Sequence, residues 1–429
     1  RFSLFLLPHF LHQRFGRLPW KDLVAPAIAL ARDGHAVDST RSETIRNNVR
    51  RLSLFPATAA LFLPGGHPPE PGTTWRQSEL AATLQLIADS GASGFYRGRT
   101  ADLIVAEMRR GGGIITHQDL LNYQALWREP IRISYRGWSI YSMPPSSSGG
   151  VTMAEMFNIL GGYRKLPAFG TAELLHLEVE AMRRAFTDRN RFLGDPDVVS
   201  MPLGRLLSDE HAAMLRRQIS RRRATPSTAM PPIMEGSETT HYSIVDEAGN
   251  AVGVTTTLND NFGSAVAVTG AGFMLNDEMD DFSTKPGMPN DYGLVQGESN
   301  AIAPNKRMLS AMTPTIVVNP EGRLEVVLGA PGGPRSITAV WQVISNVIDH
   351  HMDLAQAVYA PRIHHQALPD SIRWERGGID PAVRRKLEKM GHAFFAEPGS
   401  NAVIEAIRVT PRGLEGVTDP RINRRAAGF

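Results

Sequence analysis

The spacing of apolar residues predicts a mainly helical first half of the chain. Up to about residue 230, hydrophobic side chains recur at the spacing of one face of an amphipathic helix. Strands are predicted at Ile131–Tyr141, and the Ser- and Gly-rich stretch Met143–Gly150 is predicted to be a loop. The predicted helices of this half are Trp20–Arg32, Ser78–Ser90, Thr100–Arg110, Val151–Leu160 and Thr171–Phe192.

A polar, Pro-rich stretch without periodicity, Arg221–Glu238, predicts an exposed loop or linker. Beyond it, apolar and polar residues alternate. His241–Asp246 and Ala251–Thr257 flank the turn Glu247–Asn250, which predicts a β-hairpin. The remaining predictions are strands at Ala271–Leu275, Thr313–Val318 and Arg323–Gly329, and helices at Ile337–Asp349, Leu354–Tyr359 and Pro381–Met390.

Composition places the chain among globular proteins. Its 429 residues are 42% hydrophobic and 21% charged, enough for one large domain or two ordinary ones. The net charge is only +3, and the basic stretch Leu215–Arg223 lacks interleaved aromatics. We therefore expect a solvated helix end or a linker there, and no nucleic acid as partner. No segment is apolar enough to predict a membrane span, and the lack of cysteine excludes disulfides, thiolate zinc sites and a Cys nucleophile.

The chain begins with Arg1 and the apolar stretch RFSLFLLPHFL. This stretch faintly resembles the apolar part of a signal peptide, but no small-residue cleavage site follows it. Because the first residue is not Met, we expect the chain to be part of a longer protein.

Thr239 and Thr240 stand between the predicted linker and the predicted hairpin. A threonine hydroxyl inside a chain is a poor nucleophile, because no base takes its proton. At the start of a chain, the free α-amine, with a pKa near 8, can serve as that base. A cut between Glu238 and Thr239 would create this arrangement. Taken alone, the pair is more typical of an ordinary strand start than of a catalytic site, since threonine is a good strand residue.

Two further stretches can contribute to chemistry. Leu275–Phe282, LNDEMDDF, is rich in acids but lacks the spacing of an EF-hand loop. It is either a solvated turn or a set of carboxylates for a substrate ammonium group. Gly329–Ser336, GAPGGPRS, lacks the ending of a phosphate-binding loop. Its pair Gly332-Gly333 either forms a tight turn or aims backbone N–H groups at an oxyanion.

These motifs together resemble the γ-glutamyltransferase (γ-glutamyltranspeptidase) family. The similar stretches in the second half are TTHYSIVDEAGNAVGVTTTLN, LNDEMDDFSTKPGMPNDYGLV, NAIAPNKRMLSAMTPTIV and GAPGGPRSI. The first half contributes PAIALARDGHAV, GFYRG, GGIITHQDLLNY, YRGWSIYSMPPSSSGG and DRNRFLGDPD. The resemblance extends from about Phe15 to the C-terminus.

The resemblance implies an α+β fold, a four-layer αββα sandwich of the N-terminal nucleophile hydrolase type. It implies a precursor that cuts itself at Glu238–Thr239 into a large subunit, 1–238, and a small subunit, 239–429, which together form one structural domain. It implies a self-processing enzyme that cleaves γ-glutamyl amides such as glutathione and passes the acyl group to water or to the amine of an amino acid or peptide. It also implies export to the periplasm or outside the cell, and neither a cofactor nor a metal.

The same resemblance implies roles for individual residues. Thr239 corresponds to the nucleophile, and Thr257 to a second threonine that hydrogen-bonds to it. Tyr292 corresponds to the tip of a lid loop. The implied oxyanion hole is Gly332 and Gly333, and the implied donor-binding residues are Asn259, Glu278 and Asp281 for the α-amine and Ser310 for the α-carboxylate.

The chain departs from the family pattern in two respects. Ala311 occupies the position of a second carboxylate-binding serine. The N-terminal region that carries an arginine for the donor carboxylate has no counterpart here, and Arg1 and Arg14 match it only by residue type. We therefore expect the chain as printed to bind γ-glutamyl donors poorly.

Two other functions remain open on sequence grounds. An acylase for β-lactam side chains or γ-linked polymers would suit the relaxed pocket implied by Ala311. An inactive paralogue that serves as a binding module is the second alternative, which the intact threonines and glycines disfavour. The pairs His350-His351 and His364-His365 lack metal-ligand spacing, so we interpret them as structural or helix-end histidines.

Overall fold

A computed structural model describes residues 3–227, 239–422 and 425–428. The chain forms two compact units, Arg1–Trp127 with Phe262–Asp277 (unit 1) and Arg128–Asn261 with Glu278–Phe429 (unit 2). Each unit takes residues from both sides of Thr239. The two units follow from how the residues pack, whereas the two predicted subunits follow from a cut in the chain. The units therefore do not test the subunit boundary, which stays a prediction.

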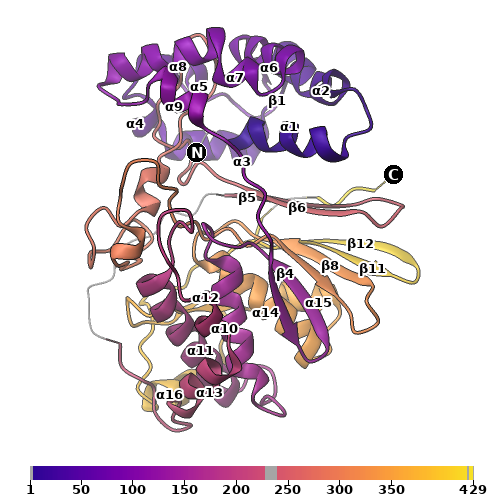
Figure 1. The fold of residues 1–429 in the computed structure, drawn as a ribbon, viewed down its shortest axis with the longest axis vertical. Coiled ribbons are helices and arrows are strands. Elements are labelled where there is room, and N and C mark those ends of the chain that lie inside the picture. The colour runs from indigo at the N-terminus through magenta and orange to yellow at the C-terminus, as the bar shows by residue number, and fades with distance from the viewer. Residues whose placement is uncertain (1–2, 228–238, 423–424, 429) are drawn as a thin grey trace. The chain divides into compact units, whose positions relative to one another are not determined.

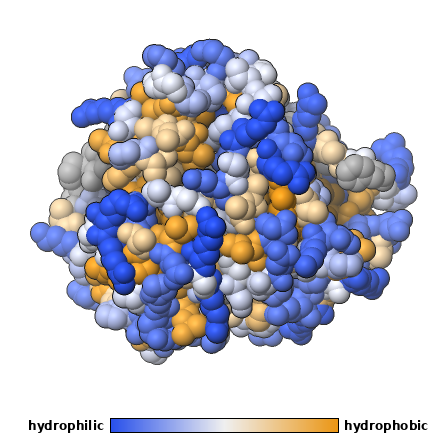
Figure 2. Space-filling view, turned by 90° about the horizontal axis from the view of Figure 1, so that it is seen from above, coloured by the Kyte–Doolittle hydropathy of each residue, from blue (hydrophilic) through white to orange (hydrophobic). Residues whose placement is uncertain are grey.

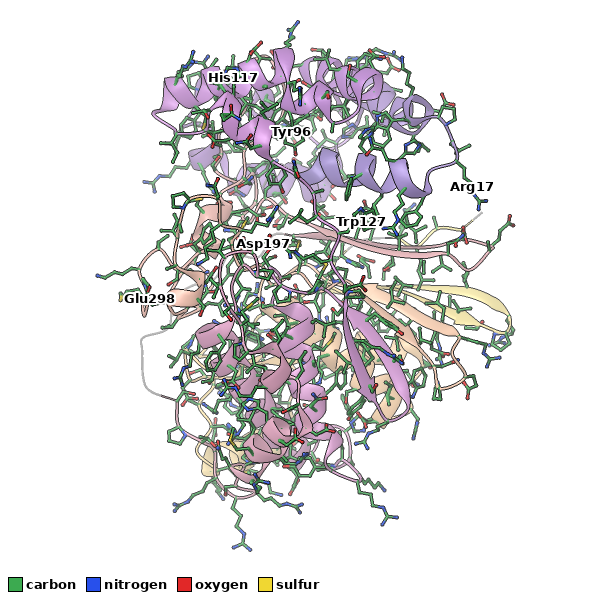
Figure 3. All side chains as sticks on the ribbon, viewed as in Figure 1. Arg17, Tyr96, His117, Trp127, Asp197 and Glu298 are labelled. Carbon is green, nitrogen blue, oxygen red and sulfur yellow. The ribbon has the colours of Figure 1, made fainter. Side chains whose placement is uncertain are left out.

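Unit 1 is mainly helical (Figure 1). Its core packs α2 against α6 and α8 through residues such as Ile28, Ile87 and Ile104. Tyr96, labelled in Figure 3, stacks on Tyr123 with ring centroids 5.8 Å apart. The elements of unit 1 are α1 Ser3–Phe15, α2 Trp20–Asp33, β1 His35–Ala36, α3 Ser39–Asn47, α4 Val49–Leu52, α5 Pro56–Phe62, η1 Pro64–Gly66, β2 Thr74–Trp75, α6 Ser78–Ser90, α7 Ser93–Tyr96, α8 Gly98–Gly111 and α9 His117–Asn122.

The strand predicted at Ala271–Leu275 is wrong. These residues form a single isolated bridge, between Ala267 and Met274, and no regular strand. Gly272 has a φ of +73°, which interrupts an extended chain. The side chains of Ala271 and Leu275 pack into the helical core of unit 1. Their apolar character therefore reflects packing against helices and not membership of a sheet.

Unit 2 is built around an antiparallel sheet, six-stranded over the described residues, in the order β12-β11-β8-β7-β4-β3. The alternation of apolar residues predicted β7 and β8, and it did not identify β11 and β12. The strands are β3 Ile131–Tyr135, β4 Trp138–Ser142, β7 Thr315–Val318, β8 Leu324–Gly329, β11 Glu405–Thr410 and β12 Gly413–Thr418.

The predicted hairpin forms a separate two-stranded sheet of β5 (Thr240–Val245) and β6 (Ala251–Thr256). It packs on the large sheet through β8 and β11. Val326 and Leu328 of β8 lie in the core shared with helices, whereas Val327 faces the hairpin, 3.5 Å from where a Cβ of Gly253 would lie. Alternate residues of one strand therefore serve opposite faces.

A helical layer covers the other face of the large sheet in unit 2 (Figure 1). Its central helices α10, α11 and α14 are predicted correctly to within a few residues. Unit 2 thus contains a helical layer followed by two β layers. Its helices and short elements are α10 Gly149–Gly161, α11 Ala172–Phe192, α12 Leu203–Leu206, α13 Asp209–Arg217, η2 Glu278–Asp281, η3 Glu298–Asn300, α14 Arg335–Asp349, α15 Leu354–Tyr359, β9 Ile363–His364, β10 Arg373–Trp374 and α16 Pro381–Lys389.

The predicted linker Arg221–Glu238 is only partly exposed. Arg221–Arg223 are exposed, as expected. Thr225, by contrast, donates its hydroxyl to Glu180, and the Ser227 N–H donates to Asp370 at 2.6 Å. The rest of the linker, including Glu238 at the predicted cut, lies outside the described residues.

The surface is mixed in polarity. On the face shown in Figure 2, hydrophilic side chains are interspersed with hydrophobic ones. Among the described residues, no helix is both long enough and apolar enough to cross a membrane.

Candidate active site

The open end of the hairpin brings two threonines together. Thr240 of β5 pairs with Thr256 of β6, so Thr239 and Thr257 lie next to each other just beyond the last paired residues. The Thr257 hydroxyl accepts the backbone N–H of Asn259 at 2.8 Å. The register of the hairpin therefore sets both hydroxyls at one edge of the sheet.

This edge opens into a small pocket of unit 2. Seven residues predicted from the sequence line it, and so does Ala311. Gly332 directly precedes the lining residue Gly333, and Glu278 belongs to the same short helix as Asp281, but neither of them lines the pocket. The lining residues are Arg189, Thr239, Thr257, Asn259, Asp281, Tyr292, Leu294, Ser310, Ala311, Met312, Gly333, Pro334 and Ser336.

One wall of the pocket is acidic. Asp281 and Glu278 end and begin the short helix η2, and Glu278 is only 1% exposed. The Asp281 backbone carbonyl accepts side-chain N–H groups from Gln296 at 3.1 Å and Asn300 at 2.7 Å. These two buried amides fix the position of the turn. The Asp281 carboxylate therefore belongs to a backbone segment that hydrogen bonds hold in place, which suits the binding of a cationic group of a ligand.

Asn259 and Tyr292 close the pocket on a second side. Asn259 has a φ of +78°, a conformation that Asn tolerates better than most residues. Its carbonyl accepts the Tyr292 hydroxyl at 3.1 Å, and within the described chain its side-chain N–H₂ group is buried without an acceptor. Burial, and then the Asp281 charge, raise the pKa of Tyr292, so the phenol stays protonated and donates. With the Asn259 amide as a donor and the Asp281 carboxylate as an acceptor, the pocket offers both kinds of hydrogen-bonding group.

Ser310 is held by the serine-rich loop before α10. Its carbonyl accepts the Ser148 N–H at 2.7 Å and the Ser148 hydroxyl at 2.8 Å, and its N–H donates to Ser146. The predicted loop Met143–Gly150 is found over residues 143–148, and Gly149 and Gly150 already belong to α10. The serines of this loop are buried and have structural roles.

A second contact anchors the chain just before Ser310. The Arg307 N–H donates to Asp195 at 2.7 Å, and its guanidinium donates to Asp197, labelled in Figure 3, at 3.0 Å. The Ser310 hydroxyl is thus presented to the pocket from a segment fixed at several points.

The glycine pair lies at the start of α14. Gly332 and Gly333 have φ values of +132° and +55°, which favour glycine. A Cβ on Gly332 would lie 2.8 Å from the Ala402 Cβ. The carbonyl of Ala402 is in turn held by Arg362, which is fully buried and paired with Asp419 at 2.5 Å. Backbone N–H groups at the start of a helix form the positive end of its dipole, where negative charge is stabilised.

Substitution Gly333→Ala is expected to destabilise the protein and to displace Tyr292. The new Cβ would lie 2.4 Å from Tyr292 Cε1, and φ is +55°, so strain and clash together should cost about 1–3 kcal/mol. Urea unfolding monitored by fluorescence measures this. Gly322→Ala is the matched control, because Gly322 has a φ of +78° with no atom within 4 Å of a new Cβ. Equal losses in both variants would show that the Tyr292 contact contributes nothing.

Arg189 is a pocket residue that the sequence did not single out. It lies on α11, is 1% exposed, and donates to Ser148 Oγ at 3.3 Å and to Gln296 Oε1 at 2.6 Å. It therefore connects the side chains that hold Ser310 with those that hold Asp281. Burial lowers its pKa to about 10, an effect that the Asp281 charge opposes. The sequence feature that could have identified Arg189 is its position, within DRNRFLGDPD, on the apolar face of a predicted helix.

The paired histidines make structural contacts. His364 is buried and bonds to Thr338 Oγ1 and Gln366 Oε1, each at 2.9 Å, and burial lowers its pKa to about 3. His365 bonds to Asp370 at 3.1 Å. His350 follows the last residue of α14, where the sequence predicted a helix end.

Comparisons with known proteins give the fold and site a context. The family model described as gamma-glutamyltranspeptidase matches residues 9–429. A glutathione hydrolase proenzyme of Pseudomonas sp. (strain A14) is 42% identical over 96% of this chain and 74% of its own length. An acylase ACY 1 proenzyme of Pseudomonas sp. (strain V22) is 38% identical over 93% of this chain and 69% of its own. The crystal structure of cephalosporin acylase from Bacillus halodurans superposes with a TM-score of 0.84, at 29% identity, over 96% of this chain and 75% of that one.

The fold is that of the N-terminal nucleophile hydrolases, which confirms the predicted α+β class. Within that class, the chain belongs to the γ-glutamyltranspeptidase family. The family predicted from the sequence motifs is therefore confirmed.

Proposed function

We propose that the protein cuts itself before Thr239 and then transfers γ-glutamyl groups from amides such as glutathione to water or to an amine. The observation that supports this most strongly is the pocket that contains Thr239, Thr257, Asp281, Ser310 and Gly333 together. A nucleophile, a carboxylate, a hydroxyl donor and a helix start all face one space. Self-cleavage accords with the word proenzyme in the names of both curated relatives.

The reaction needs only groups of this chain. The Thr239 hydroxyl oxygen attacks the γ-carbonyl carbon of the donor while the α-amine of Thr239 takes its proton. Backbone N–H groups at Gly332-Gly333 stabilise the negative charge that develops on the carbonyl oxygen. The C–N bond then breaks, and the leaving amine takes the proton. Water or a second amine attacks the resulting ester, and Thr239 recovers its proton.

The polar walls of the pocket explain the choice of a γ-glutamyl donor. Its α-ammonium group needs an anion, which Asp281 supplies with Glu278 in the same turn, and an amide such as Asn259 can bind next to it. Its α-carboxylate needs donors, of which the Ser310 hydroxyl is one. Arg189 adds a positive charge near both serine and carboxylate walls.

A pair of donors tests the proposal. Purified protein should hydrolyse γ-glutamyl-p-nitroanilide much faster than glutaryl-p-nitroanilide, which has the same reactive amide and carboxylate but no α-amine. Release of p-nitroaniline measures both rates. Preference for the glutaryl compound would contradict the proposed donor class while leaving the nucleophile intact.

An acylase acting on other acyl groups is the second candidate function. It is favoured by Ala311, which lines the pocket where a second hydroxyl donor would strengthen carboxylate binding. The identity to an acylase proenzyme and the superposition on a cephalosporin acylase accord with this alternative. The same donor pair separates the two functions.

Substitution Ala311→Ser is expected to lower KM for γ-glutamyl donors about 2- to 12-fold. A new hydroxyl next to Ser310 adds one hydrogen bond to the donor carboxylate, worth about 0.5–1.5 kcal/mol net. Steady-state kinetics with γ-glutamyl-p-nitroanilide measures the change. The control donor is 4-aminobutyryl-p-nitroanilide, which lacks the carboxylate. An equal fall in KM for both donors would contradict a carboxylate contact at this position.

Maturation and location follow as part of the proposal. The precursor would yield a large subunit, 1–238, and a small subunit, 239–429, that remain associated, with an amino acid or peptide as acceptor. Export from the cytoplasm accords with membership of this family. Fractionation of the source cells, followed by immunoblotting for the small subunit, tests the location.

A further inference from the structure

Two buried clusters in unit 2 combine histidine with carboxylate, and neither takes part in the chemistry above. They are His176–Glu180–His392 and Glu155–Asp188–His211, and in each the nitrogen and oxygen atoms that suit a metal lie within 4.8 Å of one another. A metal ion needs lone pairs that other hydrogen bonds do not already occupy. The hydrogen-bond partners of each candidate ligand atom therefore indicate which of the two clusters can bind a metal ion.

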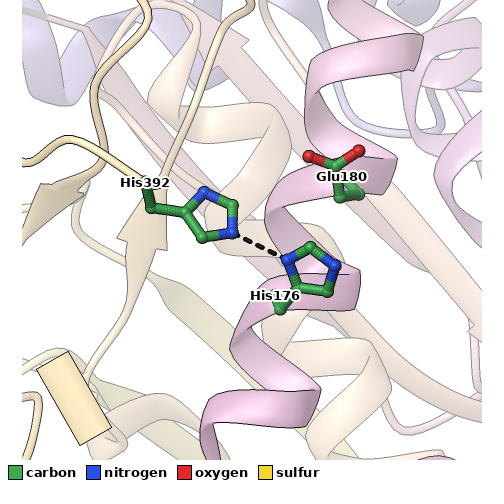
Figure 4. Close-up of side chains that lie close together, drawn as sticks. All are labelled: His176, Glu180 and His392. Atoms are coloured by element: carbon green, nitrogen blue, oxygen red, sulfur yellow. Dashed lines mark hydrogen bonds between the residues drawn. The ribbon is translucent and has the colours of Figure 1, made fainter. Parts of the chain in front are cut away.

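In the cluster of Figure 4, His392 Nδ1 is buried without a partner in the described chain, but the other candidate ligand atoms are occupied. His176 Nδ1 bonds to His392 Nε2 at 2.7 Å, and His176 Nε2 bonds to the Ser220 carbonyl at 2.6 Å. Both Glu180 oxygens accept hydrogen bonds, and two of the donors are guanidinium groups, which repel a cation. The donors to Glu180 are Arg183 Nε, Arg184 Nη1, Thr225 N and Thr225 Oγ1.

The second cluster differs in its carboxylates, because within the described chain no guanidinium group donates to Glu155 or Asp188. Glu155 of α10 is 1% exposed. Its carboxyl lies within hydrogen-bonding reach of the Asp188 carboxyl, and within the described chain no N–H group donates to its oxygens. Asp188 of α11 bonds to His211 Nε2 of α13 at 2.6 Å. A buried carboxyl without a donor is costly unless a proton or a cation neutralises it.

The charges of this cluster also favour a cation. With a neutral imidazole, two ionised carboxylates carry a charge of −2 in a buried space. A divalent cation would balance both carboxylates.

We propose that Glu155, Asp188 and His211 bind one divalent transition-metal ion, with Zn²⁺ as the representative of its class. Two carboxylate oxygens and one imidazole nitrogen are the ligand types that such ions share, and water can complete the shell. The Asp188 side chain is 14% exposed and lines an open cavity, which gives the ion a path from solvent.

The site would connect three helices that already pack together, α10, α11 and α13. Each ligand comes from a different helix, so a bound ion cross-links them and should raise the melting temperature of the folded protein. Asp188 directly precedes Arg189 in α11, so the ion would also stabilise the helix turn that carries this pocket residue.

Metal binding to tag-free, chelator-treated protein tests the proposal. Titration with Zn²⁺ by calorimetry, with elemental analysis after gel filtration, should give about one equivalent bound and a rise in melting temperature. Glu155→Gln, which keeps the shape of the side chain, should weaken binding at least tenfold and abolish the thermal shift. Asp188→Asn, at a partly exposed position, should do the same if folding of the first variant is impaired.

Two control variants make the test specific to this cluster. His392→Gln removes a ligand of the cluster in Figure 4, and His117→Ala removes an exposed histidine of unit 1, labelled in Figure 3. Both should bind Zn²⁺ like the unmodified protein. Loss of binding only in His392→Gln would overturn the proposal, and so would unmodified protein that binds no Zn²⁺ at all.

Discussion

Substitution Thr239→Ala is expected to leave the chain uncut and the enzyme inactive. The same hydroxyl serves self-cleavage and donor attack in the proposed mechanism, so one change should abolish both. Loss of the nucleophile of a hydrolase typically costs about 10⁶-fold in kcat. Gel electrophoresis should show one band in place of two, and release of p-nitroaniline from the γ-glutamyl donor should fall to background.

Two neighbouring variants separate a chemical effect from a structural one. Thr239→Ser keeps a hydroxyl and should still cut itself, more slowly. Thr240→Ala changes the adjacent exposed residue, which belongs to β5 and does not line the pocket. It should cut normally. An uncut Thr240→Ala protein, together with a normally cut Thr239→Ala protein, would move the nucleophile to Thr240.

Substitution Asp281→Asn is expected to lower kcat/KM for γ-glutamyl-p-nitroanilide about 30- to 5,000-fold. Removal of one partner of a buried charge pair costs about 2–5 kcal/mol, and here the unpaired group would be the donor ammonium. The asparagine keeps the size of the side chain, and the backbone of Asp281 is held through its carbonyl by Gln296 and Asn300. Maturation should therefore proceed, which gel electrophoresis checks.

The donor without an α-amine shows whether the loss is specific. Glutaryl-p-nitroanilide should be hydrolysed by Asp281→Asn at nearly the original rate. Asp280→Asn makes the same change in charge one residue away, where the carboxylate accepts the backbone N–H of Asp291. It should leave the ratio of the two donor rates unchanged. If Asp281→Asn lowers both donor rates equally, Asp281 does not recognise the ammonium.

The sequence predicted most of the fold because the signals were local. Helical spacing identified α6 and α11 closely, and alternation around Asp246–Asn250 identified the hairpin, whose turn is closed by a hydrogen bond from the Asn250 N–H to Asp246. The error at Ala271–Leu275 has a tertiary cause. A short apolar run suits a strand and a helix-packed segment equally well, and its partners, which the local pattern does not contain, determine its conformation.

The candidate site likewise contains residues that the sequence located and residues that it did not. Motif order located Thr239, Asp281 and Ser310, which lie far apart in the chain and in one pocket in the structure. Arg189 was missed because its importance depends on what surrounds it, namely Ser148 and Gln296. The same holds for Glu155, whose lack of donors is visible only in three dimensions.

The central claim is that the chain becomes active by a cut directly before Thr239. Intact-mass measurement and N-terminal sequencing of the purified, active protein test it directly. The account predicts two chains, the smaller of which starts Thr-Thr-His-Tyr-Ser, and labelling by a γ-glutamyl affinity reagent on the first threonine. A single uncut chain that hydrolyses γ-glutamyl amides at full rate would contradict it.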